Sequence, residues 1–321
     1  MTSNETLMYL SDSDLDTMGI QPSDVADAIE SALVAKVEGR LHTSPKTAIL
    51  PGDGRYMMST LAVGGDDFIV VKQVSVCPGN ADRGLAAING AIMVLDAETG
   101  LLRAVLGANW ITAVRTAALS AVAARRLADP NSEIITFVGA GVQAHSHLAA
   151  LAELFPLKQI RILGRGQANI EALRQNANER GFETVVSATA ESAIRGADLV
   201  VSSITMDFSI KPFLDANWLK PNAFAAITDA CIPWIPESMG AFGTIIVDDR
   251  VQESESENPM LPYEQITGDL TELVSGVVAL GQSDNPATFA FRGISLGDYA
   301  AAVLAVRKAE ELGVGQRIAS N

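Results

Sequence analysis

From residue 133 onward, short runs of β-branched and other apolar residues alternate with longer Ala- and Leu-rich stretches that have helical spacing. This alternation is typical of a parallel sheet wrapped by helices. The intervening stretches, such as Ala168–Arg180, supply the crossovers that parallel strands need. The runs predict six strands of one doubly wound sheet: Glu133–Val138, Gln159–Leu163, Glu183–Ser187, Asp198–Ile204, Ala223–Thr228 and Thr244–Asp248.

The first 115 residues have a different pattern. A helix is expected over Pro22–Glu38, with Ser23 as its N-cap, and a second helix over Ile111–Leu127. The Ala-rich stretch near Asp298–Leu312 predicts a helix that packs back on this part of the chain. Alternating apolar and polar positions predict four short strands, at Thr47–Leu50, Arg55–Ala62, Phe68–Gln73 and Ala91–Asp96.

These patterns predict an α/β protein that combines a Rossmann-type, doubly wound parallel sheet with an α+β N-terminal domain. A length of 321 residues is enough for about two domains, each with its own core. We place the N-terminal domain at residues 1–118, together with the C-terminal helix of residues 298–321. The sheet domain is placed at residues 119–297.

A glycine-rich turn follows the first predicted strand of the sheet and opens a helix. The first glycine of such a turn permits the sharp bend, the second lets the backbone approach a pyrophosphate, and a small third residue allows close packing of helix on strand. Amide groups at the start of the helix then meet the phosphate. The residues predicted to bind a dinucleotide in this way are Gly139, Ala140, Gly141, Val142, Gln143 and Ala144.

The end of the second strand bears on which dinucleotide is bound. An acidic residue there holds the adenosine 2′-hydroxyl of NAD, but this chain has Gly164-Arg165-Gly166. Arg165 can pair with a 2′-phosphate or lie over the adenine. A phosphate site usually brings a second cation or a hydroxyl, and the next three residues supply neither. The expected cofactor is therefore NAD(H), with NADP(H) as the open alternative and contacts from Gly164 and Arg165.

The overall charge narrows the range of partners. The sequence has 23 Lys and Arg against 38 Asp and Glu, a formal net charge of −15. Such a surface repels nucleic acid and anionic membranes, so a small-molecule ligand is expected. The run Glu253–Glu257, with carboxylates at alternate positions, is interpreted as a solvated loop.

The cysteine and histidine content is low. Two cysteines, Cys77 and Cys231, are too few for a disulfide framework, and the chain starts without a basic segment followed by an apolar run. A cytoplasmic protein is therefore expected. No cluster of residues has the spacing of metal ligands, and we predict no metal site.

Arg115 interrupts an apolar helix, where an unpaired buried charge would be costly. It therefore needs an anion, and two interpretations are open. Arg115 either pairs with a carboxylate of the protein itself or presents its planar fork to a substrate carboxylate. Asp229, at the end of the fifth predicted strand, also has two readings: an acid–base group at the ligand-binding edge of the sheet, or an N-cap.

Several motifs, in this order along most of the chain, resemble the ornithine cyclodeaminase/mu-crystallin family. They are Val71-Lys72-Gln73-Val74, Gly84-Leu85, Thr112-Ala113-Val114-Arg115-Thr116-Ala117-Ala118, Gly139-Ala140-Gly141-Val142-Gln143-Ala144 and Thr228-Asp229-Ala230. The resemblance implies a homodimer, an N-terminal domain for dimerisation and substrate binding, and chemistry on amino acids or their imines.

The resemblance also implies a site. Cations at Lys46, Lys72 and Arg115 would clamp a substrate carboxylate, with Asp229 as the acidic group. Lys72 and Asp229 are the expected catalytic residues, and Arg115, Thr116 and Asp229 are expected to contact the cofactor.

Departures from the family pattern bear on the substrate. Arg55 stands where cyclodeaminases carry a Glu that faces a substrate amine, so a cationic substrate such as ornithine is disfavoured. Four cations, with Arg55 included among the substrate-binding groups, exceed what one carboxylate requires. The expected activity is NAD(P)H-dependent reduction of an α-imino acid, specifically iminosuccinate to aspartate. Open alternatives are an alanine dehydrogenase or cyclic ketimine reductase, an ornithine cyclodeaminase, and a non-enzymatic binding protein of the mu-crystallin kind.

Overall fold

The computed structural model describes residues 6–65, 67–280 and 284–319. The chain divides into two compact units. Unit 1 comprises Met1–Arg115 and Gly293–Asn321, and unit 2 comprises Thr116–Arg292. Helix α3, Ala108–Leu127, carries the chain from one unit into the other.

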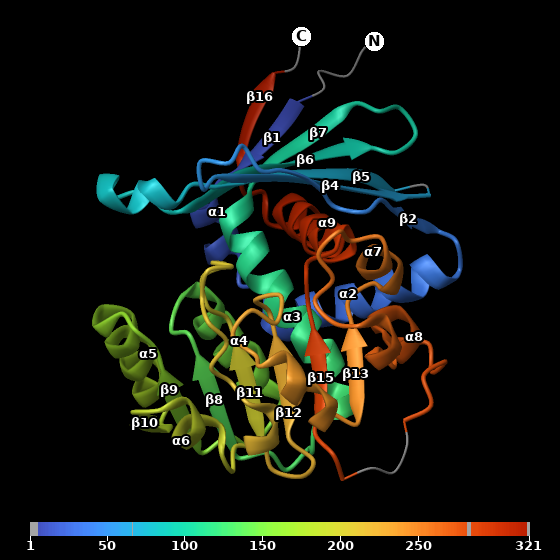
Figure 1. Cartoon of the computed structure of the whole chain (residues 1–321). Helices are drawn as coiled ribbons and strands as arrows, with labels where there is room; N and C mark the ends of the chain where they lie inside the picture. The colour runs from blue at the N-terminus through green and yellow to red at the C-terminus, as the bar shows by residue number, and fades with distance from the viewer. Residues whose placement is uncertain (1–5, 66, 281–283, 320–321) are drawn as a thin grey trace. The chain divides into compact units, whose positions relative to one another are not determined.

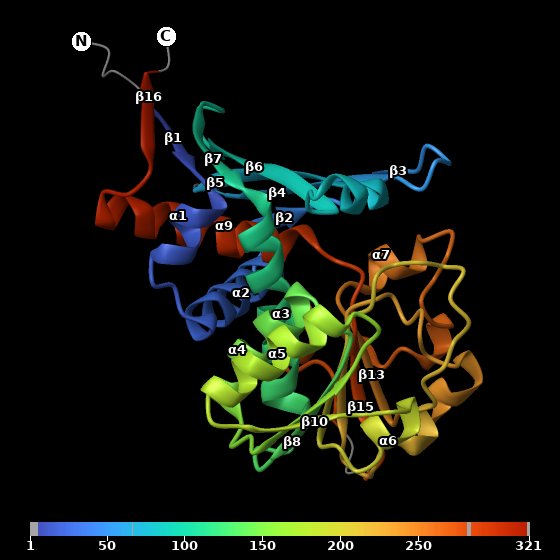
Figure 2. The ribbon, with the colours of Figure 1, turned by 90° about the vertical axis from the view of Figure 1, so that its left-hand side faces the viewer.

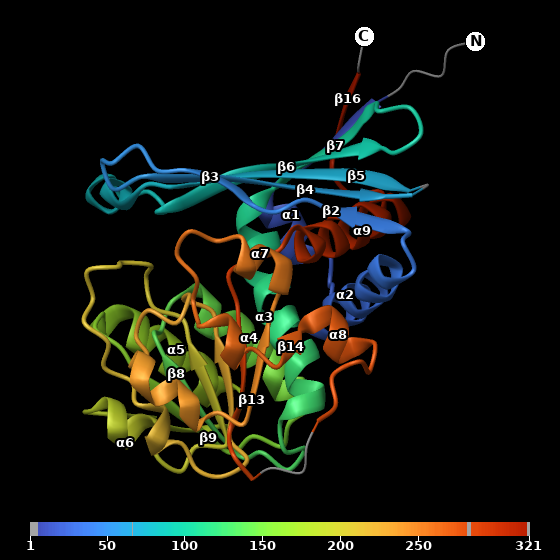
Figure 3. The same cartoon turned by 45° about the vertical axis from the view of Figure 1, so that its right-hand side comes forward.

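Unit 1 is built on an eight-stranded sheet in the order β16-β1-β7-β6-β5-β4-β2, with β3 also paired to β4 (Figure 3). All pairings are antiparallel except that of β1 with β7. The strands are β1 Thr6–Leu10, β2 Leu41–Thr43, β3 Thr47–Ile49, β4 Tyr56–Gly64, β5 Phe68–Val76, β6 Ile88–Asp96, β7 Leu102–Gly107 and β16 Gln316–Ala319. The four strands predicted in this part correspond to β3, β4, β5 and β6. The other four were not predicted, and two of them have only three and four residues.

Helices cover one face of this sheet. Helix α9, Ser295–Leu312, lies against β4 and β5, and α2, Pro22–Val37, packs on α9 (Figures 1 and 2). The short α1, Asp12–Thr17, follows β1. The predicted N-cap of α2 was wrong: the cap is Gln21, because Pro22 already occupies the first helical position, which suits its fixed φ and missing N–H.

The opposite face of the sheet carries an apolar row. Leu61, Val71, Met93, Val105 and Tyr9 are direct cross-strand partners on β4, β5, β6, β7 and β1. They lie on the face away from α9, because their neighbours in each strand are the buried ones. Three of these side chains are 39% to 42% exposed. We call these five residues the outer row.

Unit 2 has an all-parallel sheet in the order β10-β9-β8-β11-β12-β15-β13-β14 (Figure 1). Together with unit 1 it gives the predicted mixed α/β fold with a Rossmann-like sheet. The strands are β8 Ile134–Val138, β9 Gln159–Leu163, β10 Glu183–Val186, β11 Leu199–Ser202, β12 Phe224–Ile227, β13 Thr244–Val247, β14 Gly268–Asp269 and β15 Ala287–Ala290. All six strands predicted here are present. The sequence missed β14 and β15, the second of which is a four-residue strand between β12 and β13.

Helices and 3₁₀ turns connect these strands. They are α4 Val142–Leu154, α5 Gln167–Glu179, α6 Ala190–Ile194, α7 Arg250–Ser254, α8 Leu270–Val274, η2 Ala216–Trp218, η3 Pro236–Ala241 and η4 Tyr263–Gln265, while η1, Pro78–Arg83, belongs to unit 1. No helix in the described part of the chain is both long and apolar enough to cross a membrane.

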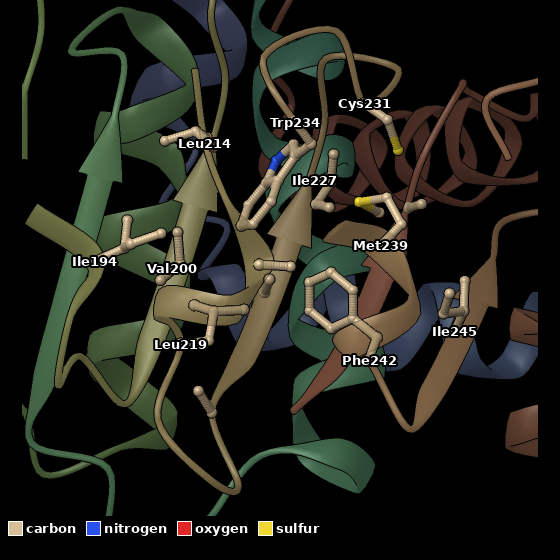
Figure 4. Close-up of a cluster of buried hydrophobic side chains, with 14 of the residues drawn as sticks. Ile194, Val200, Leu214, Leu219, Ile227, Cys231, Trp234, Met239, Phe242 and Ile245 are labelled. Carbon is tan, nitrogen blue, oxygen red and sulfur yellow. The ribbon is translucent and has the colours of Figure 1, made fainter. Parts of the chain in front are cut away.

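A hydrophobic cluster fills one side of the unit 2 sheet (Figure 4). Trp234, from the loop after β12, is its largest fully buried side chain, and the ring centroid lies 5.8 Å from that of Phe242. Leu214, Ile227 and Met239 belong to the same cluster. Such packing fixes the loops that end the strands, where ligands bind in sheets of this kind.

The acidic run at 253–257 is only partly a solvated loop, and for Glu253 that interpretation was wrong. The Glu253 side chain is 2% exposed and accepts a hydrogen bond from Nε of Arg292 at 3.0 Å. It also accepts one from the backbone N–H of Met260. A half-buried guanidinium and a backbone donor satisfy this carboxylate, which charge patterning cannot reveal, whereas Glu255 and Glu257 are exposed.

Candidate functional site

The glycine turn of unit 2 follows β8 directly. Gly139 has φ of 98°, a conformation that L-residues other than glycine rarely adopt. A Cβ at Gly139 would lie 2.6 Å from the carbonyl oxygen of Ser203, on the loop after β11. Position 139 therefore requires glycine for two reasons, the backbone conformation and the close approach of a second loop.

Gly141 has a different role in the same turn. It is the N-cap residue of α4 with an ordinary φ of −86°, and a Cβ there would meet nothing within 4 Å. The space in front of the first amides of α4 is thus open on the side where a pyrophosphate approaches. Ala144, one turn into the helix, is fully buried and permits close packing on the sheet. These features fit a dinucleotide.

The remaining residues of the turn are split between surface and interior. Val142 is 69% exposed, while Ala140 is buried beside the strand ends. The carbonyl of Gln143 accepts a hydrogen bond from Nδ1 of His147, a fully buried residue whose Nε2 faces the hydroxyl of Ser120 at 2.9 Å. Burial lowers the pKa of His147 to about 4. A neutral imidazole therefore ties the start of α4 to α3.

The end of β9 lies beside the turn. A Cβ on Gly164 would be 3.7 Å from that of Ala140, and Arg165 is exposed. Hydrogen bonds from Ser209 lower the pKa of Asp207, and the charge of Arg165 adds to this effect. Residues 164–169 contain no carboxylate.

Asp229 follows β12 and is fully buried. Its Oδ1 accepts a hydrogen bond from the hydroxyl of Ser202 at 3.1 Å, and Oδ2 accepts one from the amide of Ile204, also at 3.1 Å. Burial raises the pKa of Asp229 to about 7, while these two hydrogen bonds oppose the rise. Asp229 thus binds the same loop after β11 whose Ser203 borders Gly139, and its pKa suits proton transfer near neutral pH.

The chain leaves Asp229 through an unusual turn. Ala230 and Cys231 have φ of 53° and 60°, so two consecutive non-glycine residues adopt the left-handed conformation. Each such residue costs of the order of 1 kcal/mol, and strain of this kind gathers at functional sites.

A cluster of buried charges lies in unit 1. Lys72 on β5 and Thr60 on β4 are cross-strand partners on the face covered by α9. Nζ of Lys72 donates to Oδ1 of Asp298 on α9 at 2.9 Å, and the hydroxyl of Thr60 donates to Oδ2 at 3.0 Å. Nε of Arg115 lies 3.1 Å from the same Oδ1. Two buried cations therefore share one buried carboxylate.

Burial and the neighbouring charges together shift the pKa values of this cluster. Desolvation lowers the pKa of Lys72 to about 8, although the charge of Asp298 opposes this change; Arg115 and Lys46 lower the pKa further. Burial acts to raise the pKa of Asp298, but Lys72 and Arg115 outweigh it and lower that pKa below its ordinary value. Arg115 thus pairs with a carboxylate of the protein itself, whereas the family resemblance favours a substrate carboxylate as its partner.

The other two predicted substrate cations differ in their surroundings. Lys46, in the segment between β2 and β3, is half-buried, acts on the pKa of Lys72 and lies 5.9 Å from the centre of the Tyr56 ring. Arg55 is exposed and forms an ion pair with Asp53 at 2.7 Å. The structure thus brings Lys46 near Lys72, whereas Arg55 lies in an exposed loop with its own counter-ion.

Sequence reasoning missed three residues of these sites. Asp298 is an acid in an Ala-rich helix, the same signal that singled out Arg115, and it could have been found that way. Ser202 and Trp234 carry no comparable signal, because a serine after an apolar strand and a tryptophan in a loop are ordinary. Thr116, predicted to contact the cofactor, is buried on α3 as the first residue of unit 2.

Comparison with known proteins places the chain among enzymes with this architecture. Ketimine reductase mu-crystallin of Rattus norvegicus is 30% identical over 243 residues, 74% of this chain and 75% of that protein. Delta(1)-pyrroline-2-carboxylate reductase of Bacillus cereus is 26% identical over 264 residues, 79% and 81% of the two chains.

Solved structures show the same fold. An archaeal alanine dehydrogenase dimer with bound NAD superposes with a TM-score of 0.85 at 23% identity, over 98% of this chain and 99% of that one. The iminosuccinate reductase of Paracoccus denitrificans in complex with NAD⁺ gives 0.82 at 22% identity, over 98% and 99%. The family model "Ornithine cyclodeaminase/mu-crystallin family" matches residues 8–312, and the chain belongs to this family.

Proposed function

We propose that this protein is an NAD(P)H-dependent reductase of α-imino acids. The observation that carries the proposal is Asp229, a buried carboxyl group with a pKa of about 7 that binds the loop bordering the glycine turn. A reductase of an imine needs a group that exchanges a proton with nitrogen near neutral pH, close to where the dinucleotide binds. The names of two relatives, a ketimine reductase and a pyrroline-2-carboxylate reductase, support the same reaction class.

The cofactor assigned to the glycine turn is NAD(H). The open space at Gly141 and the N-terminal amides of α4 would hold its pyrophosphate, and Gly164 and Arg165 lie where the adenosine would be bound. When bound, the nicotinamide supplies the hydride. Arg115 and Thr116, at the point where α3 passes from unit 1 to unit 2, are proposed as further contacts.

The substrate carboxylate is assigned to the buried charge cluster of unit 1. Lys72 and Arg115 lie together at Asp298, and ammonium and guanidinium groups are the side chains that bind carboxylates most strongly. These two groups would fix the acid end of the substrate, which orients its C=N carbon. Lys46 adds a nearby positive charge.

Asp229 is assigned the proton. In its protonated form it would donate to the imine nitrogen, because a protonated imine accepts hydride more readily, and in its ionised form it would stabilise the iminium charge. A pKa of about 7 keeps both forms populated near neutral pH.

Within this class, the specific substrate we propose is iminosuccinate, reduced to aspartate. Lys46 and Arg55 are the groups proposed to meet its second carboxylate, and Arg55 would exchange Asp53 for the substrate. A cyclic ketimine with one carboxylate is the second candidate. The neutralisation of one cation by Asp298 favours it, since the positive charge left over is smaller than four cations suggested.

We also propose that the protein works as a homodimer. The outer row of unit 1 presents Leu61, Val71, Met93, Val105 and Tyr9 across five strands. A contiguous apolar row on an open sheet face is typical of a surface that a second copy covers. The archaeal alanine dehydrogenase is described as a dimer, which supports the same assembly here.

One steady-state experiment tests the activity and its substrate. The protein is supplied with NADH or NADPH, ammonia and either oxaloacetate or pyruvate, and separately with the cyclic imine Δ1-pyrroline-2-carboxylate, while cofactor oxidation is followed. The proposal expects oxaloacetate with NADH to give the highest kcat/KM. A preference for the cyclic imine would select the second candidate, and no oxidation with any of the three would refute the reductase.

A further inference from the structure

Ser202 and Trp234 form a buried chain of hydrogen bonds that ends at Asp229, and neither residue has a part in the proposed reaction. The Ser202 hydroxyl donates to Oδ1 of Asp229 at 3.1 Å, and the indole Nε1–H of Trp234 donates to the Ser202 oxygen at 3.0 Å. All three side chains are at most 1% exposed. Water is thus kept from the chain Trp234–Ser202–Asp229.

The chemistry of the indole gives this chain a direction. An indole nitrogen is a donor only, so the Ser202 oxygen facing it must accept. The single hydroxyl proton of Ser202 is then directed to Asp229. Because the amide of Ile204 is also a donor only, both oxygens of Asp229 face donors, an arrangement that suits the carboxylate form.

The backbone around Trp234 explains why the indole stays in place. The left-handed pair Ala230 and Cys231 turns the chain back, and the amide of Trp234 donates to the carbonyl of Cys231 at 3.0 Å. Trp234 forms a parallel bridge with Leu214, and its ring packs into the hydrophobic cluster beside Phe242 (Figure 4). An indole held on two sides is a fixed donor for Ser202.

We propose that Trp234 and Ser202 are positioning residues that orient the Asp229 carboxylate and hold it as an acceptor for its acid–base role. The inference rests on the proposed function, since that role belongs to the reductase reaction. Cys231 is the titratable neighbour of Asp229. Burial raises the pKa of its thiol well above the ordinary value, and the charges of Asp229 and Glu253 raise it further, while Arg292 lowers it. Hydrogen bonds and burial, more than charges, therefore govern how Asp229 binds its proton.

The test is a pH titration of the Asp229 carboxyl group by difference infrared spectroscopy, with the band assigned by its loss in Asp229→Asn. Ser202→Ala removes the donor and should raise the titration midpoint by roughly half a unit to one unit, the worth of one hydrogen bond. Trp234→Phe keeps an aromatic ring in the cluster but frees the Ser202 hydroxyl, so a smaller rise is expected. Trp218→Phe is the matched control, because Trp218 packs against the same cluster outside the chain of hydrogen bonds.

The results separate this inference from the proposed function. A rise in Ser202→Ala and Trp234→Phe, with Trp218→Phe unchanged, supports the positioning chain, and the same shift should appear in the pH profile of kcat/KM. If folded Trp234→Phe titrates at the wild-type midpoint, the indole does not direct the chain and the proposal is overturned. If the carboxyl midpoints shift as expected but the wild type reduces no imine, the positioning chain stands and the reductase fails.

Discussion

Nζ of Lys72 lies 2.9 Å from Oδ1 of Asp298, although 226 positions separate the two residues along the chain. Both side chains are buried, and Arg115 contacts the same oxygen. The helix α9 thus returns a carboxylate to the sheet face that carries the lysine. Without it, two positive charges would be buried together, which is why the cluster depends on Asp298.

Replacing Asp298 by Asn should destabilise the protein by about 3 to 5 kcal/mol, because it leaves Lys72 and Arg115 without their shared anion. The same change should lower the pKa of Lys72 below about 8, since the carboxylate is the group that raises it. Chemical denaturation of Asp298→Asn, Lys72→Met and the double variant measures the coupling. Independent losses that simply add would show that the pair does not interact.

Thr60→Val is the matched control for that cycle. It removes the hydrogen bond to Oδ2 of Asp298 but leaves every charge in place. A loss of about 1.5 to 3 kcal/mol is expected, as for a single hydrogen bond to a charged group.

Asp229→Asn should separate activity from stability. The variant should lose about 10²- to 10⁴-fold in kcat, as expected for a missing acid–base group.

The raised pKa of Asp229 also makes stability depend on pH. The folded wild type retains its proton up to about pH 7, whereas the unfolded chain releases it near the ordinary value of 3.8. The stability that this proton confers is complete below 3.8 and is lost as the pH rises through 7. Denaturation of both proteins at pH 5 and pH 8.5 should show that the wild type loses roughly 2.5 to 3 kcal/mol relative to Asp229→Asn over this interval. An equal decrease in the variant would refute the raised pKa.

His147 should give the opposite slope. Its folded pKa of about 4 lies below the ordinary 6.5, so the unfolded state binds more protons between these values. Relative to a variant that cannot titrate at this position, the wild type should therefore lose up to about 3 kcal/mol as the pH falls from 6.5 to 4. His147→Gln, which cannot titrate, should lack this loss in denaturation curves measured at both pH values. A wild type whose His147 contribution does not change over this range would contradict the buried neutral imidazole.

Arg55→Ala tests the dicarboxylate substrate. If Arg55 binds the second carboxylate, kcat/KM for oxaloacetate with ammonia should fall about tenfold, since a charged hydrogen bond contributes about 1.5 kcal/mol or more. The value for pyruvate should be unchanged. Asp53→Asn frees Arg55 from its ion pair and should not reduce turnover of the diacid. Equal losses on both substrates would remove Arg55 from the site.

Met93→Glu should weaken the proposed homodimer, because it places a carboxylate in the centre of the outer row, which a second copy would desolvate. Sedimentation at several protein concentrations should show more monomer, and added salt should favour the dimer by screening the net charge of −15 on each copy. Val186→Glu, on an exposed strand of unit 2, is the control and should leave association unchanged. A wild type that stays monomeric at high concentration would end this proposal.

The sequence predicted the features that depend on neighbouring residues and missed those that depend on pairing between distant parts of the chain. The six strands predicted for unit 2 have local apolar runs, whereas β15 has the mixed sequence Ala-Thr-Phe-Ala and pairs with β12 on one side and β13 on the other. The glycine turn was predictable because its chemistry lies in consecutive residues. Strands β1 and β16 pair with each other from opposite ends of the chain, and no local pattern reports such a pairing.

The candidate site was predictable one residue at a time, but its pairings were not. The sequence indicated that Arg115 needs an anion; only the three-dimensional fold brings Asp298 to it. Arg55 and Lys46 were equivalent candidates in the sequence. In the structure Arg55 pairs with the exposed Asp53, whereas Lys46 lowers the pKa of Lys72. Long-range pairing of charges, unlike periodicity, leaves no trace in neighbouring residues.

The left-handed pair at Ala230 and Cys231 also affects the stability and the rigidity of this turn. Glycine would adopt both conformations without steric cost, so a chain selected for stability alone would favour glycine there. Glycine would also increase the conformational entropy of the backbone, both in the unfolded chain and in the turn itself, so the indole of Trp234 would be held less firmly. The side chains at Ala230 and Cys231 therefore cost folding stability while they restrict the turn that leads to the indole, an exchange of stability for a defined site.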